Sequence, residues 1–242
     1  MSGSEPPSVT RGQANVIGVA LLLGIAVVSM GALTASVGTV VESTASEADA
    51  ERVSSDLDSA LQPVATTGPR RGTVTFSSGR LAPVDRSVEV RADGEVVERL
   101  AVDALVFESG DRRVAFHAGA IVRGEDGTGW LVTEPPVTVG EDVIVIGAAR
   151  LGDGVGSVSG RGGVTATVES DVSHDRRDLG TATFSVAVET NAPGAWERSF
   201  RQQGATVDRE PGSPTTVVAT FEGDRQGYLV VHDLDAEVSR NE

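Results

Sequence analysis

Apolar and small residues form one long uncharged block near the start of the chain. No charged side chain occurs between Gly12 and Val41, and residues 16–33 are almost entirely Val, Ile, Leu, Ala and Gly. About 20 such residues in a helix span the hydrocarbon core of a bilayer. The pattern therefore predicts a membrane-spanning helix over about residues 16–41.

The helical pattern continues beyond this block with a different character. Val53, Leu57 and Leu61 follow at helical spacing with Glu, Asp and Ser between them, and Pro63 then ends the pattern. We therefore expect a single helix over residues 13–62, apolar in its first half and amphipathic in its second. Such a helix suits a stalk or a packing element.

Small residues recur within the apolar block at a spacing typical of helix packing. Gly24, Gly31 and Gly38 lie seven residues apart, and Gly31 and Ala35 lie four residues apart. Small side chains at this spacing let a second helix approach closely. The alternative is that glycine is simply common in membrane spans. We predict that these four residues form a helix-packing face.

Beyond the predicted helix, apolar and polar residues alternate. About ten short segments rich in Val, Thr and aromatic residues are separated by turns that contain Gly and Asp. The dipeptide Asp93-Gly94 and residues 109–111 each separate two segments as the turn of a hairpin would. We also interpret the acidic segments 171–178 and 222–226 as connections between strands. This pattern predicts an antiparallel sandwich or barrel.

One segment of this region has helical spacing. Trp196 and Phe200 lie one turn apart, with Pro193 before them and Gly204 after them. We expect a short helix that packs both aromatic side chains on a sheet. The predicted fold class is therefore α+β: a long N-terminal transmembrane and stalk helix, then a mainly antiparallel β-sandwich-like domain over residues 63–242 with one short helix.

Composition excludes several classes of function. The chain has no cysteine, which excludes disulfides, thiolate metal sites and thiol nucleophiles. The net charge of −15 and the isoelectric point near 4.6 make nucleic acid a poor partner. Carboxylates in excess without any lysine are typical of proteins that work in concentrated salt, where screening lengths fall to about 3 Å at 1 M. A GC-rich genome also explains the missing lysine.

The chain has no recognisable catalytic or metal-binding motif. His117, His174 and His232 are far apart in the sequence, and we interpret His117 and His232 as surface residues. No Gly-x-Ser-x-Gly elbow of a serine hydrolase occurs. The acid-rich loops lack the ligand spacing of a calcium-binding EF-hand. The sequence leaves open whether a Ser–His–Asp triad assembles from distant residues. We therefore predict no enzymatic activity, no cofactor and no metal site.

The segment Arg-Gly-Gln-Ala-Asn-Val-Ile-Gly at residues 11–18 resembles the start of haloarchaeal archaellins and type IV pilin-like proteins. In that family a prepilin peptidase removes a polar leader just before the apolar helix. The resemblance implies a cytoplasmic leader over residues 1–12 and a cut between Gly12 and Gln13, with Arg11 as the recognition residue. It also implies that the retained helix packs against other pilin-like subunits.

The resemblance further implies a location and a function. It predicts a pilin-like structural protein of a halophilic archaeon, in pilus assembly or surface adhesion. Its single span would lie in membrane lipid, with the N-terminus cytoplasmic and residues 63–242 outside the cell. Arg11 before the span and Glu42 behind it agree with this orientation. The alternative is a membrane-anchored extracellular binding module that does not polymerise.

Overall fold

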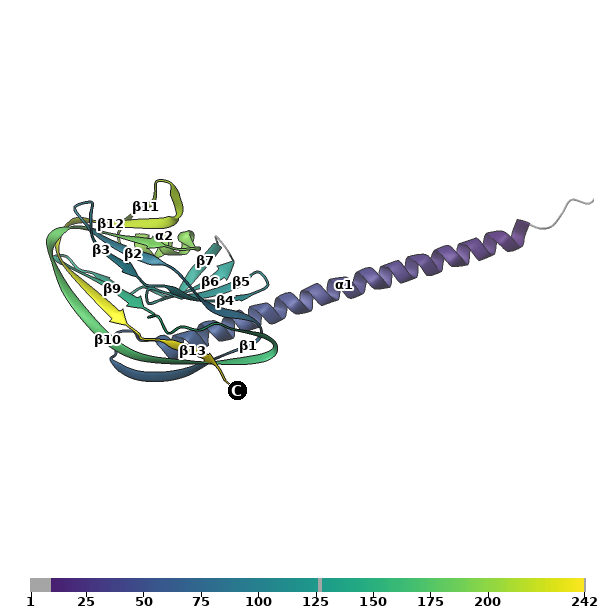
Figure 1. Ribbon diagram of the computed structural model, residues 1–242. Helices are drawn as coiled ribbons and strands as arrows, with labels where there is room; N and C mark the ends of the chain where they lie inside the picture. The colour runs from purple at the N-terminus through teal and green to yellow at the C-terminus, as the bar shows by residue number, and fades with distance from the viewer. Residues whose placement is uncertain (1–9, 126–127, 242) are drawn as a thin grey trace, which may run out of the picture. The chain divides into compact units, whose positions relative to one another are not determined.

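The computed structural model describes residues 10–125 and 128–241, with side chains described for 19–33, 43–124 and 128–241. The chain forms two compact units, Met1–Thr44 and Ala45–Glu242. Helix α1, Thr10–Leu61, has 52 residues and runs from the first unit into the second. The remainder of the second unit is mostly β-sheet (Figure 1).

The predicted transmembrane helix is wrong. No helix in the described part of the chain is apolar over a length sufficient to cross a membrane. The expected span at about 16–41, and with it the single-pass membrane localisation, is therefore corrected.

The described residues of the second unit form one short helix, α2, Pro193–Gln202, and thirteen strands. The strands are β1 (Gly68–Val84), β2 (Ser87–Ala92), β3 (Glu95–Ala101), β4 (Ala104–Ser109), β5 (Arg112–His117), β6 (Ala120–Glu125), β7 (Thr128–Thr133), β8 (Val137–Val139), β9 (Val143–Arg150), β10 (Val158–Glu189), β11 (Thr206–Glu210), β12 (Ser213–Asp233) and β13 (Glu237–Arg240).

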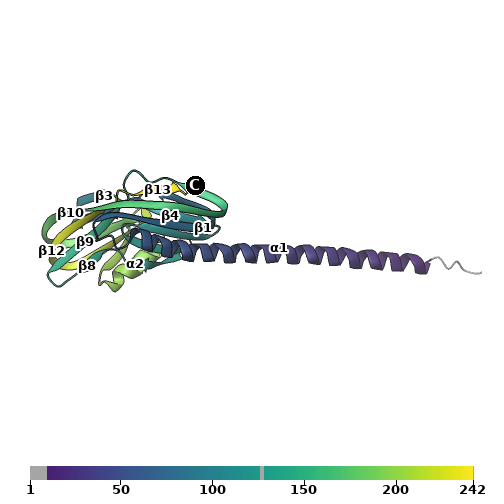
Figure 2. The ribbon, with the colours of Figure 1, turned by 90° about the horizontal axis from the view of Figure 1, so that it is seen from below.

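The strands form two sheets that the long strand β10 links into one network. The main path runs β7-β6-β5-β4-β1-β10-β12-β9-β8, and every pair along it is antiparallel except β12 with β9. The 32-residue strand β10 pairs with β1 up to Val172 and with β12 from Ser173 onward. Figures 1 and 2 both show β10 as a long, strongly curved strand. This β-rich arrangement fits the predicted β-sandwich-like domain, so the predicted fold class is wrong only in its transmembrane helix.

Two of the predicted connections are strand instead. Residues 171–178 lie inside β10, and residues 222–226 lie inside β12. The first segment pairs with β12 residue by residue, from Ser173 opposite Asp233 to Asp178 opposite Tyr228. Residues 175–178 are all exposed, so the apolar alternation that marks a half-buried strand is absent here. The backbone ladder forms regardless of side-chain polarity.

The two hairpin turns expected from the sequence are confirmed. Asp93 and Gly94 join β2 to β3, and both have positive φ, 50° and 85°, as a type I′ turn requires. Gly110, with φ 57°, lies in the turn between β4 and β5. Glycine adopts this region without the steric cost that a Cβ atom imposes.

Buried apolar side chains among the described residues of the second unit form two hydrophobic cores. The first combines Val53, Leu57 and Leu61 of α1 with strand residues that include Phe76 and Phe107. The predicted amphipathic pattern at these three helix positions is therefore confirmed, since each is at most 1% exposed. A fully buried Leu or Val contributes about 1.5–3 kcal/mol relative to an exposed one.

The second core forms around α2. Trp196 and Phe200 are buried, with ring centroids 5.6 Å apart, and Phe200 contacts Phe221 edge to face. Phe184 of β10 belongs to the same core. The prediction of a short helix docked on a sheet by two aromatic side chains is confirmed.

Carboxylates of α1 hold the helix on strand β1. Asp49 is 2% exposed and accepts hydrogen bonds from the backbone N–H groups of Ser77 and Ser78, at 2.8 and 3.2 Å, and from the Ser77 hydroxyl at 3.1 Å. Asp56 accepts from the Thr75 backbone N–H at 2.9 Å and from its hydroxyl at 3.1 Å. These bonds satisfy backbone donors of β1 where the helix covers it.

We expect the Asp49→Ala variant to lose about 3 kcal/mol of unfolding free energy. The substitution removes the acceptor of two backbone N–H groups of β1 and of the Ser77 hydroxyl, all in part-buried hydrogen bonds, and a hydrogen bond to a charged group contributes about 1.5–3 kcal/mol. Urea unfolding followed by circular dichroism measures the change. The exposed Glu51, two residues further along the same helix, provides a control as Glu51→Ala. Equal unfolding midpoints for both variants would contradict the role of Asp49.

Candidate functional sites

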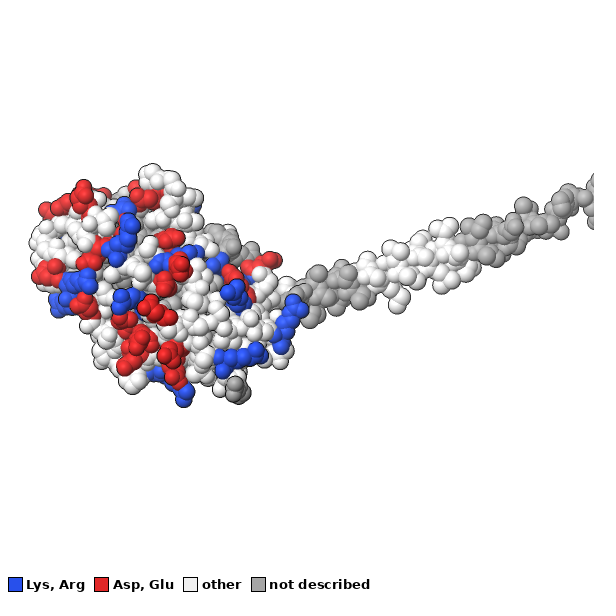
Figure 3. Space-filling view, viewed as in Figure 1, with Lys and Arg blue, Asp and Glu red and all other residues white. Residues whose placement is uncertain are grey.

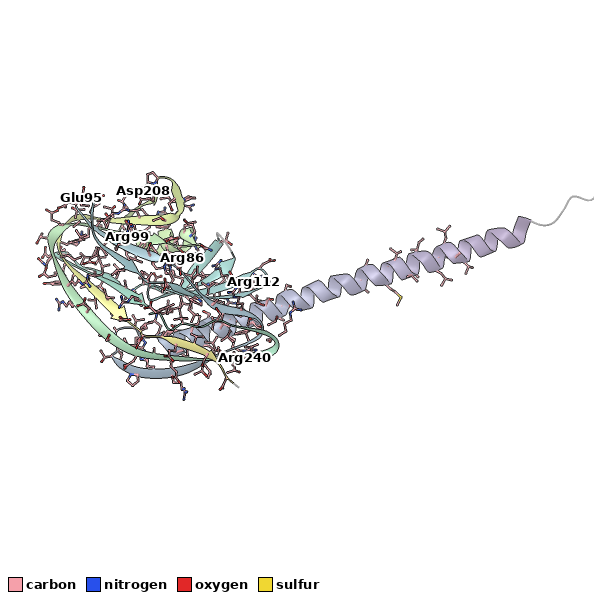
Figure 4. The ribbon with its side chains drawn as sticks, viewed as in Figure 1. Arg86, Glu95, Arg99, Arg112, Asp208 and Arg240 are labelled. Atoms are coloured by element: carbon pink, nitrogen blue, oxygen red, sulfur yellow. The ribbon has the colours of Figure 1, made fainter. Side chains whose placement is uncertain are left out.

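The described part of the first unit exposes a continuous apolar surface. Nine large apolar side chains between Val19 and Leu33 are each 57–71% exposed. Figure 3 shows no charge on the described residues of this stretch, and Figure 4 shows their side chains projecting from the helix. Contiguous apolar patches of this kind mark interaction sites when they occur on folded proteins.

Two of the predicted helix-packing residues, Gly24 and Gly31, lie within this apolar surface. A Cβ atom built at Gly24 or Gly31 meets no other heavy atom within 4 Å. A shallow apolar groove surrounds Gly24, lined by Ala20, Leu21, Gly24, Ile25, Val28 and Ser29. The side chains of Ala35 and Gly38 lie outside those that the structure describes. The same holds for the predicted processing residues Arg11, Gly12 and Gln13.

The second unit has a different surface. Acidic and basic side chains alternate over the face seen in Figure 3. Glu47, on α1, contacts Arg112 at 2.7 Å and Arg123 at 2.5 Å. Many carboxylates therefore lie beside an arginine despite the strong negative net charge of the chain. The structure separates an uncharged helix segment from a densely charged β unit.

A small cavity of about 30 Å³ lies beside His117, at the end of β5. Its polar lining includes Arg86, Arg113, Thr190 and Asn191. Arg86, labelled in Figure 4, donates to Asn191 Oδ1 at 2.6 Å and to the Asp85 carbonyl oxygen at 2.7 Å. The cavity has room for a water molecule or two.

His117 is the most unusual residue of this cavity. It is 2% exposed, its ring contacts Trp196 edge to face at 5.3 Å, and its Nε2 has no hydrogen-bond partner among the described residues. Burial, with a smaller contribution from the charge of Arg86, lowers the pKa of His117 to about 3. The expectation that His117 is a surface residue is wrong, because the two neighbouring strands and α2 enclose it.

The other two histidines form a pair that the sequence did not reveal. His174 and His232 lie opposite each other on β10 and β12, with their Nδ1 atoms 3.1 Å apart. His232 is 6% exposed, so the expectation that it is a surface residue is also wrong. The two residues are 58 positions apart, and their meeting depends on the register of two long strands. Spacing along the chain carries no signal for such a pair.

We expect the stability of the protein to fall more steeply with acid in the wild type than in a His117→Gln variant. The unfolded chain binds a proton at His117 below about pH 6.5, whereas the folded chain binds it only near pH 3. The unfolded state therefore carries the extra proton between these values, and stability is lost as the pH falls, by about 1.4 kcal/mol per unit.

Urea unfolding at pH 6.5 and at pH 5 measures this difference, which amounts to about 2 kcal/mol. A Thr190→Ser variant, which alters the lining of the same cavity without removing a titrating group, serves as the control. Parallel pH dependences in the wild type and the His117→Gln variant would show that His117 is not buried in its neutral form.

One family model matches the chain. It is described as a family of unknown function, DUF7289, and it matches residues 11–237. No curated protein and no solved structure matches the chain significantly. The matched range includes both the uncharged helix segment and nearly all of the β unit. The chain therefore belongs to the DUF7289 family, a family of unknown function.

Proposed function

We infer that the chain is a pilin-like structural subunit that assembles with other copies of itself through its apolar N-terminal helix. The observation that carries this proposal is the exposed, uncharged surface of residues 19–33. The resemblance of residues 11–18 to the start of pilin-like proteins supports it independently. In this proposal the β unit is the head that each subunit displays.

The distribution of apolar side chains favours several neighbours for each helix. Large apolar residues lie on all sides of the stretch 19–33, and no polar face remains that water would cover. A helix that is apolar all round is stable when it is buried on all sides. Each large side chain gains about 1.5–3 kcal/mol on full burial. Burial against several copies, as in a filament core, therefore gains more than burial in a simple dimer.

A second copy of the chain fits this surface better than an unrelated protein does. The stretch carries no charge, so identical helices approach each other without electrostatic repulsion. Gly24 and Gly31 present open space on one side of the helix, which permits close approach of another backbone. Helices of the same sequence supply both the apolar area and the matching small residues.

The alternative function, a binding module that does not polymerise, has one observation in its favour. The cavity beside His117 combines an unpartnered imidazole nitrogen with Arg86 and Asn191. Its small volume restricts a bound group to a few atoms. A head domain that binds a ligand is compatible with assembly, so only the absence of assembly would favour the binding module alone.

We expect a Gly24→Leu variant to assemble less well than the wild type. The added side chain fills the open space beside the helix axis and keeps a second backbone away. Leucine also favours the helix more than glycine does, so a loss of assembly does not report unfolding. Analytical ultracentrifugation gives the size distribution, and negative-stain electron microscopy shows whether filaments form.

An Ala26→Leu variant is the matched control. Position 26 lies about 200° around the helix from position 24, on a side where Leu22 and Leu33 already project. We expect this variant to assemble as the wild type does. A wild-type chain that stays monomeric would contradict the proposed function, and so would equal assembly of both variants.

We also expect the mature protein to begin at Gln13 when a prepilin peptidase is present. N-terminal sequencing or intact-mass measurement of the purified protein identifies the first residue. A Gly12→Val variant should keep the leader, because the family peptidase cuts after this glycine, whereas Gly18→Val, within the helix, should be processed normally. A mature chain that begins beyond residue 33 would remove the apolar surface and contradict the proposal.

A further inference from the structure

The paired histidines of β10 and β12 are hydrogen bonded through their Nδ1 atoms, at a separation close to that of two nitrogens bound to one metal ion. His174 and His232 are direct cross-strand partners, so their side chains lie on the same face of the sheet. Their Nδ1 atoms are 3.1 Å apart, and their rings are nearly perpendicular, at 87°. Two nitrogens bound tetrahedrally to one zinc, at about 2.0–2.1 Å each, lie about 3.3 Å apart.

The hydrogen bonding of His174 fixes which of its nitrogens carries a proton. Its Nε2 lies 3.2 Å from the backbone carbonyl oxygen of Ala65. A carbonyl oxygen only accepts, so Nε2 carries the hydrogen, and Nδ1 of the neutral ring presents a lone pair. Metal-binding histidines almost always donate their second ring nitrogen to a carbonyl or carboxylate in this way.

His232 is suited to the same role. Because His174 Nδ1 accepts, His232 Nδ1 donates the hydrogen bond between the two rings in the metal-free protein, and a cation between the two nitrogens takes the place of this hydrogen. A neutral imidazole is the form that binds metal. His232 contacts neighbouring backbone on both sides, since β12 pairs with β10 and with β9. His174 is exposed, which leaves the pair open to solvent on one side.

We propose that His174 and His232 together bind a late first-row divalent cation such as Zn²⁺, Ni²⁺ or Cu²⁺. Imidazole nitrogen is a preferred ligand of these three ions, whereas Mg²⁺ and Ca²⁺ prefer oxygen. In the described part of the chain no three His, Cys, Asp or Glu side chains gather at one point. Water therefore completes the coordination, and the ion exchanges with solvent.

The charges around the pair are balanced. Asp233, beside His232, is paired with Arg150, and Asp175, beside His174, contacts Arg177 at 2.9 Å. The guanidinium of Arg176 lies over the Tyr228 ring, 4.2 Å from its centroid. No single charge therefore dominates the approach to the pair, while the negative net charge of the chain raises the local concentration of cations.

The test is titration of the metal-free, full-length protein with ZnCl₂ by calorimetry, and with CuCl₂ by electron paramagnetic resonance. We expect one ion per chain and nitrogen hyperfine structure in the copper spectrum. His174→Gln should weaken binding by about tenfold or more, because one of the two nitrogen ligands is lost. The chain has three histidines, so His117→Gln, which leaves the pair intact, is the matched control and should bind as the wild type does.

Three results would overturn the proposal. The first is a wild-type affinity equal to that of His174→Gln. The second is a copper spectrum without nitrogen ligation. The third is displacement of Zn²⁺ by a modest excess of Ca²⁺, which would assign the binding to carboxylates. Circular dichroism of each variant shows that the β unit is folded, and none of these results depends on whether the chain assembles.

Discussion

The attachment of α1 to strand β1 is the contact on which the β unit depends. The last turns of the helix supply Val53, Leu57 and Leu61 to the first core, and Gly72 of β1 lets Ala60 lie directly against the strand. Asp49 and Asp56 complete the contact by accepting backbone hydrogen bonds from the same strand. Helix α1 therefore belongs to both units: its last turns pack in the core of the second unit, and its earlier turns form the described part of the first.

This arrangement explains why the helix changes character along its length. Residues 46–61 place apolar side chains toward a core and polar ones toward backbone donors or solvent, because one side is covered by strand. Residues 19–33 have no such cover, yet they carry no polar side. Because no part of the same unit covers these apolar side chains, they become buried only when another molecule binds to the helix. The proposed assembly is based on this argument.

The pairing of the long strands β10 and β12 places the two histidines of the proposed metal site beside each other. Strand β10 contributes residues to both cores, whereas the core residues of β12 all belong to the second, and the pairing of the two strands brings together residues that are distant in the chain. The histidine pair lies on the shared part of these strands, where the side chains around it are mostly polar. A connection at residues 171–178, as the sequence suggested, would have placed His174 in a loop and away from its strand partner His232.

The sequence by itself determined the elements whose causes are local. Periodicity predicted the N-terminal helix and its buried positions from Val53 onward, the Asp93-Gly94 dipeptide predicted a hairpin turn, and Trp196 with Phe200 predicted a short docked helix. Each of these depends on residues within a few positions of one another, so a single stretch of sequence contains the whole signal.

Only the tertiary structure decided the features that depend on pairing between distant segments. The polar stretch 171–178 is strand because its backbone pairs with residues 68–69 of β1 and 228–233 of β12, and the stretch 222–226 continues a strand whose residues 225–226 pair with 181–182 of β10. The side-chain pattern does not encode these pairings. His117 is buried because β4, β6 and α2 surround it, and His174 meets His232 through strand register. Burial and register are properties of the assembled sheet, so these residues acquire their environment only when the chain has folded.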